Sequence, residues 1–243
     1  MKKYFLTFGG PSENYRRRVS EVVNKVISLK LFDYVFGFTD QNLLNENTFL
    51  DTHKDFLINN TTGYGYWIWK SYLVNKVLDS MNDGDILLYC DVGCEINING
   101  IERLNEYFDI VKNSSSGILT FYLYPLLEYE WTKNDVFEYL KCSDDIKNTY
   151  HHVGGIFFIK KCENSINFAK KFYETCCNYN LLNDSPSITP NHPDFKHHRH
   201  DQSILSCLSK IYNSEKIQDE TYFYPNWEKD GFNYPIWAKR NRG

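Results

Sequence analysis

The stretch at residues 84–97, GDILLYCDVGCEIN, constrains the fold more than any other part of the chain. Its apolar run at 86–90 is bounded by an Asp-Gly-Asp triplet on one side and by Asp91 on the other. A short run of large apolar residues between turn residues predicts a buried strand. Asp91 then lies where this strand leaves the core, and a carboxylate at the exit of a buried strand is a candidate for chemistry.

Strand and helix patterns alternate along the rest of the chain. Strand patterns occur at 4–8, 34–38, 117–124 and 153–159, and helical spacing occurs at 19–27, 66–81, 101–111, 166–179 and 202–212. Ser12 is placed to cap the first helix, residues 43–60 form a polar segment, and residues 181–198 form a loop rich in Pro, Asn and Asp. The alternation predicts an α/β fold with a largely parallel sheet. With 243 residues, 42% of them hydrophobic, the chain fits one domain spanning 1–243.

Composition argues against several classes of function. A net charge of -4 and a pI near 6.0 provide no global basic field, which argues against nucleic acid as a partner. The seven cysteines are odd in number and contain no pair with zinc spacing, so they predict reduced thiols. The start of the chain lacks the apolar core of a signal peptide, and no apolar run reaches the length of a membrane span. We therefore expect a soluble, cytoplasmic protein.

Three polar clusters fall at the ends of predicted strands, at 7–10, 91–95 and 154–155. In open α/β sheets ligands bind beyond the carboxyl ends of the strands, so the three clusters predict one cleft. The Gly9-Gly10 pair would let the backbone approach a ligand closely, although a tight turn explains the pair equally well. Both GxGxxG and GxxxxGK[ST] are absent, which removes the main support for dinucleotide and P-loop sites.

Two further residues near this cleft are candidates for binding charge. Asp91 is suited to hold a divalent cation that bridges phosphate oxygens, or to cap the turn that follows it. Lys70 lies in GYGYWIWKSYL, at the start of the helix that precedes the Asp91 strand. It is either a solvated helix charge or a cation that reaches a phosphate group.

The densest group of functional side chains is FKHHRHDQSILS, at residues 195–206. Four imidazole or guanidinium groups at 197–200 run directly into Asp201 and Gln202 at a predicted helix start. Cations crowded beside Asp201 would lower its pKa and keep the carboxylate ionised, and His198 or His200 is a candidate metal ligand. The alternative is that Asp201 caps the helix and that the histidines belong to a surface loop.

Together these segments resemble glycosyltransferases of the GT-A fold from bacterial and viral polysaccharide synthesis. The order of the motifs carries the resemblance, which spans nearly the whole chain: the Gly9-Gly10 pair, GYGYWIWKSYLV, GDILLYCDVGCEIN, HHVGGIFFIKK, HRHDQSILS and YPIWAKRNRG. The first half looks most like small glycosyltransferases with a GYWIWK motif, and the second half is similar to the retaining galactosyltransferase and glycogenin group. The resemblance implies a GT-A fold with a nucleotide-sugar-binding half at 1–97 and an acceptor-side half at 98–243 that ends in a basic tail.

The resemblance also implies roles for individual residues. Asp91 matches the first aspartate of the DxD motif, which contacts the donor ribose and a Mn²⁺ or Mg²⁺ ion. Gly93 replaces the second aspartate, so a metal here needs another ligand besides Asp91. Glu95, Asp201 and a histidine near His200 are the candidates, and we expect His200. Asp201 and Gln202 take the catalytic position, where they hold sugar hydroxyls or flank the anomeric carbon. The donor-binding residues are then Thr7, Phe8, Gly9, Tyr15, Trp69, Lys70, Asp91, Gly93, Gly154, Gly155, Lys239 and Arg240, with Arg242 in the same basic tail.

The resemblance implies transfer of a hexose from a nucleoside diphosphate sugar to a hydroxyl of a growing glycan, and we expect the donor to be a UDP-sugar. The partners are this donor and a glycan acceptor, and the sequence leaves retention or inversion open. A catalytically inactive nucleotide-sugar or glycan-binding protein is the alternative, and Gly93 supports it. Nucleotidyl transfer predicts a basic Gly-rich loop after the first strand, which is missing.

Overall fold

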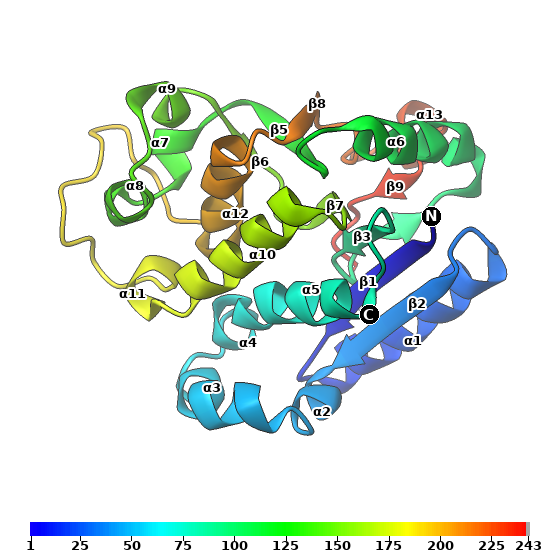
Figure 1. Ribbon diagram of the computed structural model, residues 1–243, viewed down its shortest axis with the longest axis horizontal. Coiled ribbons are helices and arrows are strands. Elements are labelled where there is room, and N and C mark those ends of the chain that lie inside the picture. Colours follow the sequence, from blue (N-terminus) through cyan, green and yellow to red (C-terminus); the bar gives the residue numbers. More distant parts are fainter. Residues whose placement is uncertain (242–243) are drawn as a thin grey trace.

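The computed structural model describes residues 1–241, and a seven-stranded sheet forms its centre (Figure 1). The strand order is β2-β1-β3-β7-β5-β6, and β8 pairs with β5. The strands of this sheet are β1 (Lys3–Gly9), β2 (Tyr34–Thr39), β3 (Ile86–Cys90), β5 (Ile118–Leu127), β6 (Tyr150–His152), β7 (Ile156–Lys160) and β8 (Glu215–Gln218). A separate two-stranded sheet joins β4 (Glu95–Ile96) to β9 (Ile236–Trp237).

Most strands of the central sheet point the same way. The β1–β2, β1–β3 and β5–β8 pairs are parallel, whereas β7 runs antiparallel to both β3 and β5, and β6 runs antiparallel to β5. Five strands therefore share one direction, and only β6 and β7 reverse it among the strands of residues 1–241. This mostly parallel sheet with flanking helices confirms the α/β fold class predicted from the sequence.

Helices cover both faces of the sheet (Figure 1). They are α1 (Glu13–Ser28), α2 (Asp40–Leu43), α3 (Asn47–Asn59), α4 (Gly63–Tyr66), α5 (Ile68–Ser80), α6 (Ile101–Asn113), α7 (Glu128–Trp131), α8 (Asn134–Leu140), α9 (Asp144–Lys147), α10 (Glu163–Cys176), α11 (Tyr179–Leu182), α12 (His200–Ile211) and α13 (Trp227–Asp230), with a 3₁₀ turn η1 (Ile98–Gly100). The helices α5, α10 and α12 pack on one face, and α1 and α6 pack on the other. Within residues 1–241, no helix combines the length and the apolar character needed to cross a membrane.

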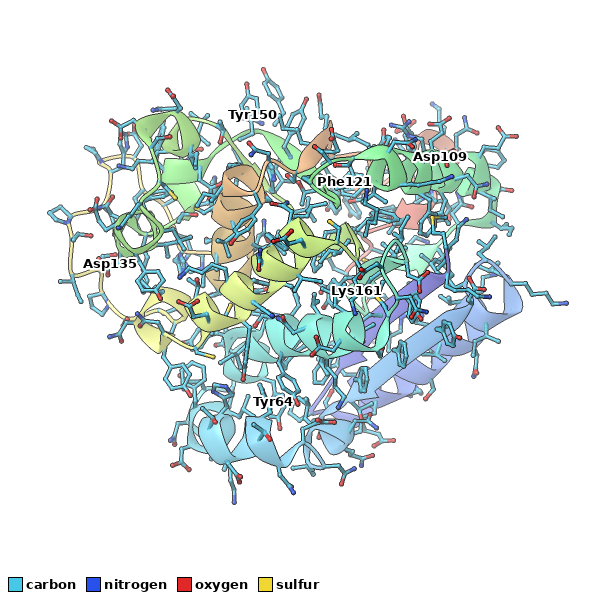
Figure 2. The ribbon with its side chains drawn as sticks, in the orientation of Figure 1. Tyr64, Asp109, Phe121, Asp135, Tyr150 and Lys161 are labelled. Atoms are coloured by element: carbon cyan, nitrogen blue, oxygen red, sulfur yellow. The ribbon has the colours of Figure 1, made fainter. Side chains whose placement is uncertain are left out.

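The apolar run that predicted a buried strand contributes side chains to two hydrophobic cores, one on each face of the sheet. Leu87 of β3 packs into the core under α5 and α10, and the adjacent Leu88 packs into the core under α1 and α6. Successive side chains of a strand point to opposite faces, so a strand covered on both sides must be apolar throughout. Figure 2 shows Phe121 of β5 within these packed layers, whereas Asp109 and Tyr150 lie at the periphery.

The structure departs from the expected elements in several places. The predicted helix at 66–81 is broken at Trp67, whose φ of 61° is left-handed and whose ring packs over Gly63. The predicted polar segment at 43–60 contains α3, because buried residues of that segment recur at helical spacing. Three short helices between 128 and 147, and strand β8, were not anticipated. The predicted strand at 153–159 begins only at residue 156, so that Gly154 and Gly155 lie between β6 and β7.

Candidate functional site

The three polar clusters that the sequence placed at strand ends lie at one edge of the sheet. Gly9 ends β1, and Asp91 directly follows β3. Because β7 runs antiparallel to β3, the start of β7 lies beside the end of β3. The amide of Asp91 accordingly donates to the carbonyl oxygen of Gly155 over 2.8 Å. This contact joins the segment after β3 to the glycine pair before β7.

Lys70, Asp91 and Asp201 form an ionic group at this edge, which we call the Lys70 trio. The Nζ atom of Lys70, in the first turn of α5, lies 2.6 Å from Oδ2 of Asp201 and 3.4 Å from Oδ1 of Asp91. It also donates to the carbonyl oxygen of Gly154 over 3.0 Å. The side chains of Lys70 and Asp201 are 3% and 5% exposed, whereas that of Asp91 is 42% exposed. Asp91 is therefore the member of the trio that solvent or a ligand can reach.

Burial and charge shift the pKa values of this group in ways that the sequence did not predict. Burial raises the pKa of Asp201 to about 6, the charge of Asp91 adds to the rise, and Lys70 opposes it. Burial alone would lower the pKa of Lys70, but the two carboxylates outweigh it and the pKa lies above its ordinary value. The predicted lowering of the Asp201 pKa by neighbouring cations is therefore wrong in direction.

The reason is that the basic side chains at 197–200 point away from Asp201. His198 shares a hydrogen bond of 2.9 Å with the carbonyl oxygen of Leu181, and the guanidinium of Arg199 lies 4.0 Å from the centre of the Trp131 ring. The ring of His200 stacks on Trp67. Residues adjacent in sequence leave a helix start in different directions, so the cation that pairs with Asp201 comes from α5 instead.

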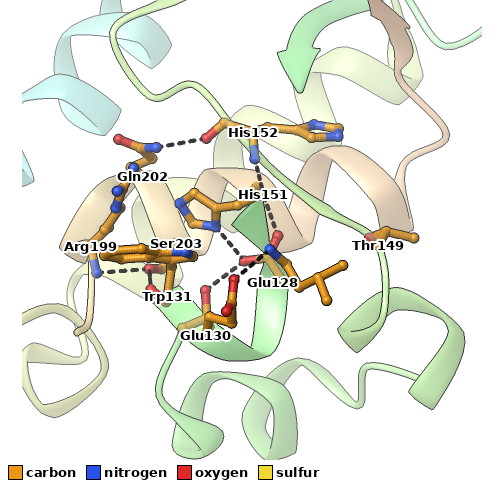
Figure 3. A network of polar contacts seen from close by, with 12 residues as sticks. Glu128, Glu130, Trp131, Thr149, His151, His152, Arg199, Gln202 and Ser203 are labelled. Atoms are coloured by element: carbon orange, nitrogen blue, oxygen red, sulfur yellow. Dashed lines mark hydrogen bonds and ion pairs between the residues drawn. The ribbon is translucent and has the colours of Figure 1, made fainter. Parts of the chain in front are cut away.

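Close backbone approach explains both glycines between β6 and β7. A Cβ atom at Gly155 would lie 2.6 Å from Oδ2 of Asp91, and one at Gly154 would lie 2.6 Å from Cβ of Gln202. Any larger residue would displace the carboxylate or the amide side chain. Gln202 in turn donates from Nε2 to the carbonyl oxygen of His152 over 2.9 Å, and its amide oxygen points away from that contact (Figure 3). Gln202 and the two glycines thus form one surface beside the trio.

A buried polar network lies behind this surface, and no sequence pattern predicted it. The Oε1 atom of Glu128, at the start of α7, lies 2.8 Å from Nδ1 of His151 (Figure 3). Glu128 also contacts Lys210 and Ser206 of α12 and is fully buried. Burial lowers the pKa of His151, whereas Glu128 raises it less strongly. Glu128 belongs to no motif, so only its contacts identify it.

Several predicted donor-binding residues have packing partners of their own. The rings of Phe8 and Trp69 are buried with their centres 3.8 Å apart, and Nε1 of Trp69 donates to the carbonyl oxygen of Gly63 over 3.0 Å. Thr7 is fully buried, and its hydroxyl has no hydrogen-bond partner among residues 1–241. The half-buried Tyr15 packs against the core under α1. Contacts between these four residues and a donor stay predictions.

The C-terminal tail lies against the loop after β3. Pairing of β4 with β9 brings the tail to Gly93, whose carbonyl oxygen accepts from the amide of Asn241 over 3.1 Å. A Cβ atom at Gly93 would lie 3.0 Å from Cα of Arg240, so the glycine admits the tail backbone. Lys239 pairs with Glu95 over 2.9 Å. The predicted basic residue at position 242 lies outside the described residues.

The exposed Arg240 has a second cation nearby. Burial lowers the pKa of Arg199, and the positive charge of Arg240 lowers it further. Burial also raises the pKa of Asp219, and Arg240 acts in the opposite direction on that carboxyl. The tail therefore brings the guanidinium of Arg240 within electrostatic reach of the helix start that carries Asp201.

Asp91 faces an ammonium group and a phenol hydroxyl. Its Oδ1 atom accepts from the hydroxyl of Tyr89 over 2.7 Å and faces Lys70. In the part of the chain that the structure describes, the group of three candidate metal ligands consists of Asp184, His197 and His200, without Asp91. A metal site that joins Asp91 and His200 stays a prediction. The cation between the carboxylates of this site is Lys70.

Comparison with known proteins finds similarity in structure only. No protein-family model matches the chain, and no curated protein matches it. A solved glycosyltransferase involved in the glycosylation of the major capsid of PBCV-1 is 13% identical, with a TM-score of 0.52 over 98% of this chain and 92% of that chain. Mouse xyloside xylosyltransferase 1, apo form, is 12% identical, with a TM-score of 0.45 over 97% of each chain. Mannose-6-phosphate isomerase from Helicobacter pylori is 12% identical, with a TM-score of 0.37 over 90% of this chain and 91% of that chain.

At 13% identity the likeness to the PBCV-1 enzyme concerns the fold. It extends over nearly the full length of both chains. The single domain spanning 1–243 stays a prediction. The narrower resemblances, to the GYWIWK group and to the galactosyltransferase and glycogenin group, stay predictions. The chain has the α/β fold of GT-A glycosyltransferases.

Proposed function

We propose that the protein transfers a hexose from a nucleoside diphosphate sugar, of the UDP class, to a hydroxyl of a glycan. The observation that carries the proposal is the Lys70 trio, in which a buried ammonium holds two carboxylates at the strand-end edge of a GT-A fold. Ligands of open α/β sheets bind at this edge. A buried ionic group is costly to assemble, so a partly exposed carboxylate held this way supports a functional role more than a structural one.

The donor sugar is proposed to lie along Gly154, Gly155 and Gln202. The two glycines let Asp91 and Gln202 lie against the backbone beside the proposed sugar position, and the tethered Gln202 amide presents an acceptor to a hydroxyl. Asp91, the exposed member of the trio, accepts hydrogen bonds from donor hydroxyls.

The departing diphosphate needs positive charge, and the chain offers it without a metal. Lys70 supplies one cation at the edge of the sheet, and Arg240 and Arg199, whose charges act on each other, supply two others. Fixed charges that face the leaving group stabilise the transition state without reorganisation. The tail at 239–241 is then the element that closes over the diphosphate, because Asn241 and Gly93 already hold it beside Asp91.

Asp201 is proposed to act at the anomeric carbon. Its carboxylate must be ionised either to stabilise an oxocarbenium-like centre or to take a proton from the acceptor. Lys70 favours the ionised form against burial, and the resulting pKa of about 6 leaves Asp201 mostly ionised at neutral pH. This is the protonation state that both stereochemical courses require.

The test is release of nucleoside diphosphate from a panel of UDP-, GDP- and dTDP-sugars. Purified protein is incubated with each donor in Mn²⁺, in Mg²⁺ and in EDTA, with and without glycan extracts. We expect one donor to turn over, and we expect activity to survive in EDTA because Lys70 stands in for the metal. Asp91→Ala and Asp201→Asn should each lower the rate at least about 100-fold, as expected for groups that act in the transition state.

A matched control keeps this test specific. Asp109 is an exposed carboxylate on α6, at the periphery of the molecule (Figure 2), and Asp109→Asn should leave the rate unchanged. Equal loss in all three variants would point to general instability and would contradict the assigned roles. Tight donor binding without turnover, even with glycan extracts, would instead identify a nucleotide-sugar-binding protein.

A further inference from the structure

Three candidate metal ligands meet where α12 begins. His200 is the first residue of α12, and Asp184 and His197 come from the long loop that joins α11 to α12 at the left edge of Figure 1. One ligand atom from each residue lies within 4.8 Å of the other two. Nε2 of His200 lies 3.7 Å from Oδ1 of Asp184.

The hydrogen bond of His200 leaves the correct nitrogen available to a metal. Its Nδ1 atom lies 3.0 Å from the carbonyl oxygen of Leu182. A carbonyl oxygen can only accept, so Nδ1 carries the proton and the lone pair belongs to Nε2, the atom that faces Asp184. Metal-binding histidines commonly donate their second nitrogen to a backbone carbonyl in this way, which fixes the tautomer and the ring orientation.

The packing around His200 holds its ring in place. The side chain is buried, stacks on Trp67 with ring centres 5.5 Å apart, and contacts the ring of Tyr66 at 4.8 Å. Its backbone has a left-handed φ of 54°, and Tyr66 and Trp67 also have positive φ values of 51° and 61°. Such conformations persist only where the surroundings determine them, and they concentrate at binding sites.

The loop that carries the other two ligands is tied down on both sides of Asp184. The Nζ atom of Lys133 donates to the carbonyl oxygens of residues 183 and 185, over 3.1 and 3.2 Å. Asp135, labelled at the left of Figure 2, accepts from the amides of residues 188 and 189 over 2.8 Å each. Asp184 is thus an exposed side chain on an anchored backbone.

We infer that Asp184, His197 and His200 form a site for a transition-metal ion of the zinc type, separate from Asp91. Two imidazole nitrogens and one carboxylate oxygen suit zinc and its neighbours, whereas Mg²⁺ prefers oxygen ligands. Ligand atoms about 2.1 Å from a tetrahedral ion lie about 3.4 Å apart, so the exposed Asp184 and His197 need to move by only about 1 Å. Three protein ligands leave the fourth position to water or to a substrate.

Metal binding at this site would fasten the 183–199 loop to the helix start that presents Asp201 and Gln202. It does not depend on the proposed transferase activity, because none of the three ligands belongs to the Lys70 trio. The site also differs from the predicted Mn²⁺ or Mg²⁺ site at Asp91 in its ligand chemistry. An ion bound there acts on the position of the loop and on thermal stability.

The test is direct metal binding by the full chain, treated with EDTA and carrying no histidine tag. We expect Zn²⁺ to bind at one ion per chain in calorimetric titration and to raise the melting temperature, with Mg²⁺ at millimolar concentration doing neither. Co²⁺ in place of Zn²⁺ should give the visible absorption of a tetrahedral site without a thiolate charge-transfer band. This spectrum separates the proposed site from binding to the seven cysteines.

His192 provides a matched control, since it is an exposed histidine on the same loop, 3.8 Å from Asp194. His197→Ala and Asp184→Asn change exposed side chains and should each weaken Zn²⁺ binding at least about tenfold, while His192→Ala leaves it unchanged. Absence of stoichiometric binding would overturn the inference. So would equal weakening by all three substitutions, or a thiolate band in the Co²⁺ spectrum.

Discussion

The ion pair between Lys70 and Asp201 yields the sharpest stability prediction, and a double-mutant cycle measures it. Lys70→Met removes the ammonium and leaves two carboxylates facing each other, one of them only 5% exposed. Asp201→Asn removes one carboxylate and leaves Lys70 with Asp91 at 3.4 Å and with the Gly154 carbonyl. The first substitution should therefore be the more harmful of the two.

The magnitude follows from the distance and the burial. At 2.6 Å and an effective dielectric constant of about 20, the Coulomb attraction is about 6 kcal/mol before desolvation is subtracted. Breaking a buried pair by removing one partner costs about 3–5 kcal/mol, because the other charge stays buried. We expect a loss in that range for Lys70→Met and about 2–3 kcal/mol for Asp201→Asn, which keeps Asp91 as a partner. The double variant should be more stable than the sum predicts by about 2 kcal/mol or more.

Chemical denaturation of the four proteins at pH 7, followed by circular dichroism, gives these free energies of unfolding. The control is a second cycle at Lys171 and Glu174, which lie 2.7 Å apart with side chains 33% and 60% exposed. An exposed pair at almost the same distance should show a coupling energy of only about 0.2–1 kcal/mol. Additive effects at Lys70 and Asp201, or equal coupling in the two cycles, would refute the argument that burial sets the strength of the trio.

The pH dependence of the Lys70→Met variant provides an internal check. Without Lys70, the pKa of Asp201 rises further above its ordinary value of 3.8, because burial is then unopposed. The folded state consequently binds a proton that the unfolded state releases, and the free energy of unfolding increases as pH falls. The penalty of the substitution should thus shrink from pH 7 to pH 5, whereas a constant penalty would contradict the account.

Three further predictions concern activity and the tail. Donor turnover should fall about tenfold per pH unit below pH 6, where Asp201 takes up a proton. A rate that stays constant from pH 5 to pH 7 would argue against a catalytic role for Asp201. Gly155→Ala places a Cβ atom 2.6 Å from the Asp91 carboxylate and should lower kcat at least about tenfold, while the circular dichroism spectrum stays that of the native protein. Full activity of this variant would show that the position of the carboxylate is not critical. Gly93→Asp should displace the tail and speed trypsin cleavage at 239–240, and unchanged cleavage would mean that the tail does not need the glycine.

The sequence predicted those elements that depend on interactions between residues close together in the chain. The apolar run before Asp91 and the helical spacing behind Ser12 both correspond to observed elements, and the hydroxyl of Ser12 accepts from the amide of Tyr15 as a cap should. The break at Trp67 was missed because a left-handed backbone at an aromatic residue runs against local preference and depends on the packing of its ring over Gly63. Tertiary contacts therefore determine the backbone conformation at Trp67.

The site shows the same division between local and distant effects. The sequence singled out Lys70, Asp91 and Asp201 one at a time, yet the ion pairs between them span separations in the chain that no motif spacing encodes. The predicted direction of the Asp201 pKa shift was wrong because basic residues adjacent in sequence were expected to lie beside the carboxylate in space. Burial is instead the dominant cause of the shift. Glu128 was missed for a related reason, since only its partners on other elements reveal it.

Gly93 connects the loss of a metal ligand with the position of the tail. The resemblance to GT-A enzymes places an aspartate there, and the structure places the backbone of Arg240 3.0 Å from where its Cβ atom would lie. A side chain at this position would compete with the tail for the same space, so a chain that packs its tail here benefits from glycine. The same residue that removes a carboxylate from the proposed site therefore admits the segment that carries Lys239 and Arg240. Positive charge for a diphosphate would then come from Lys70 and from the tail, so activity in EDTA is the outcome that the proposed function predicts.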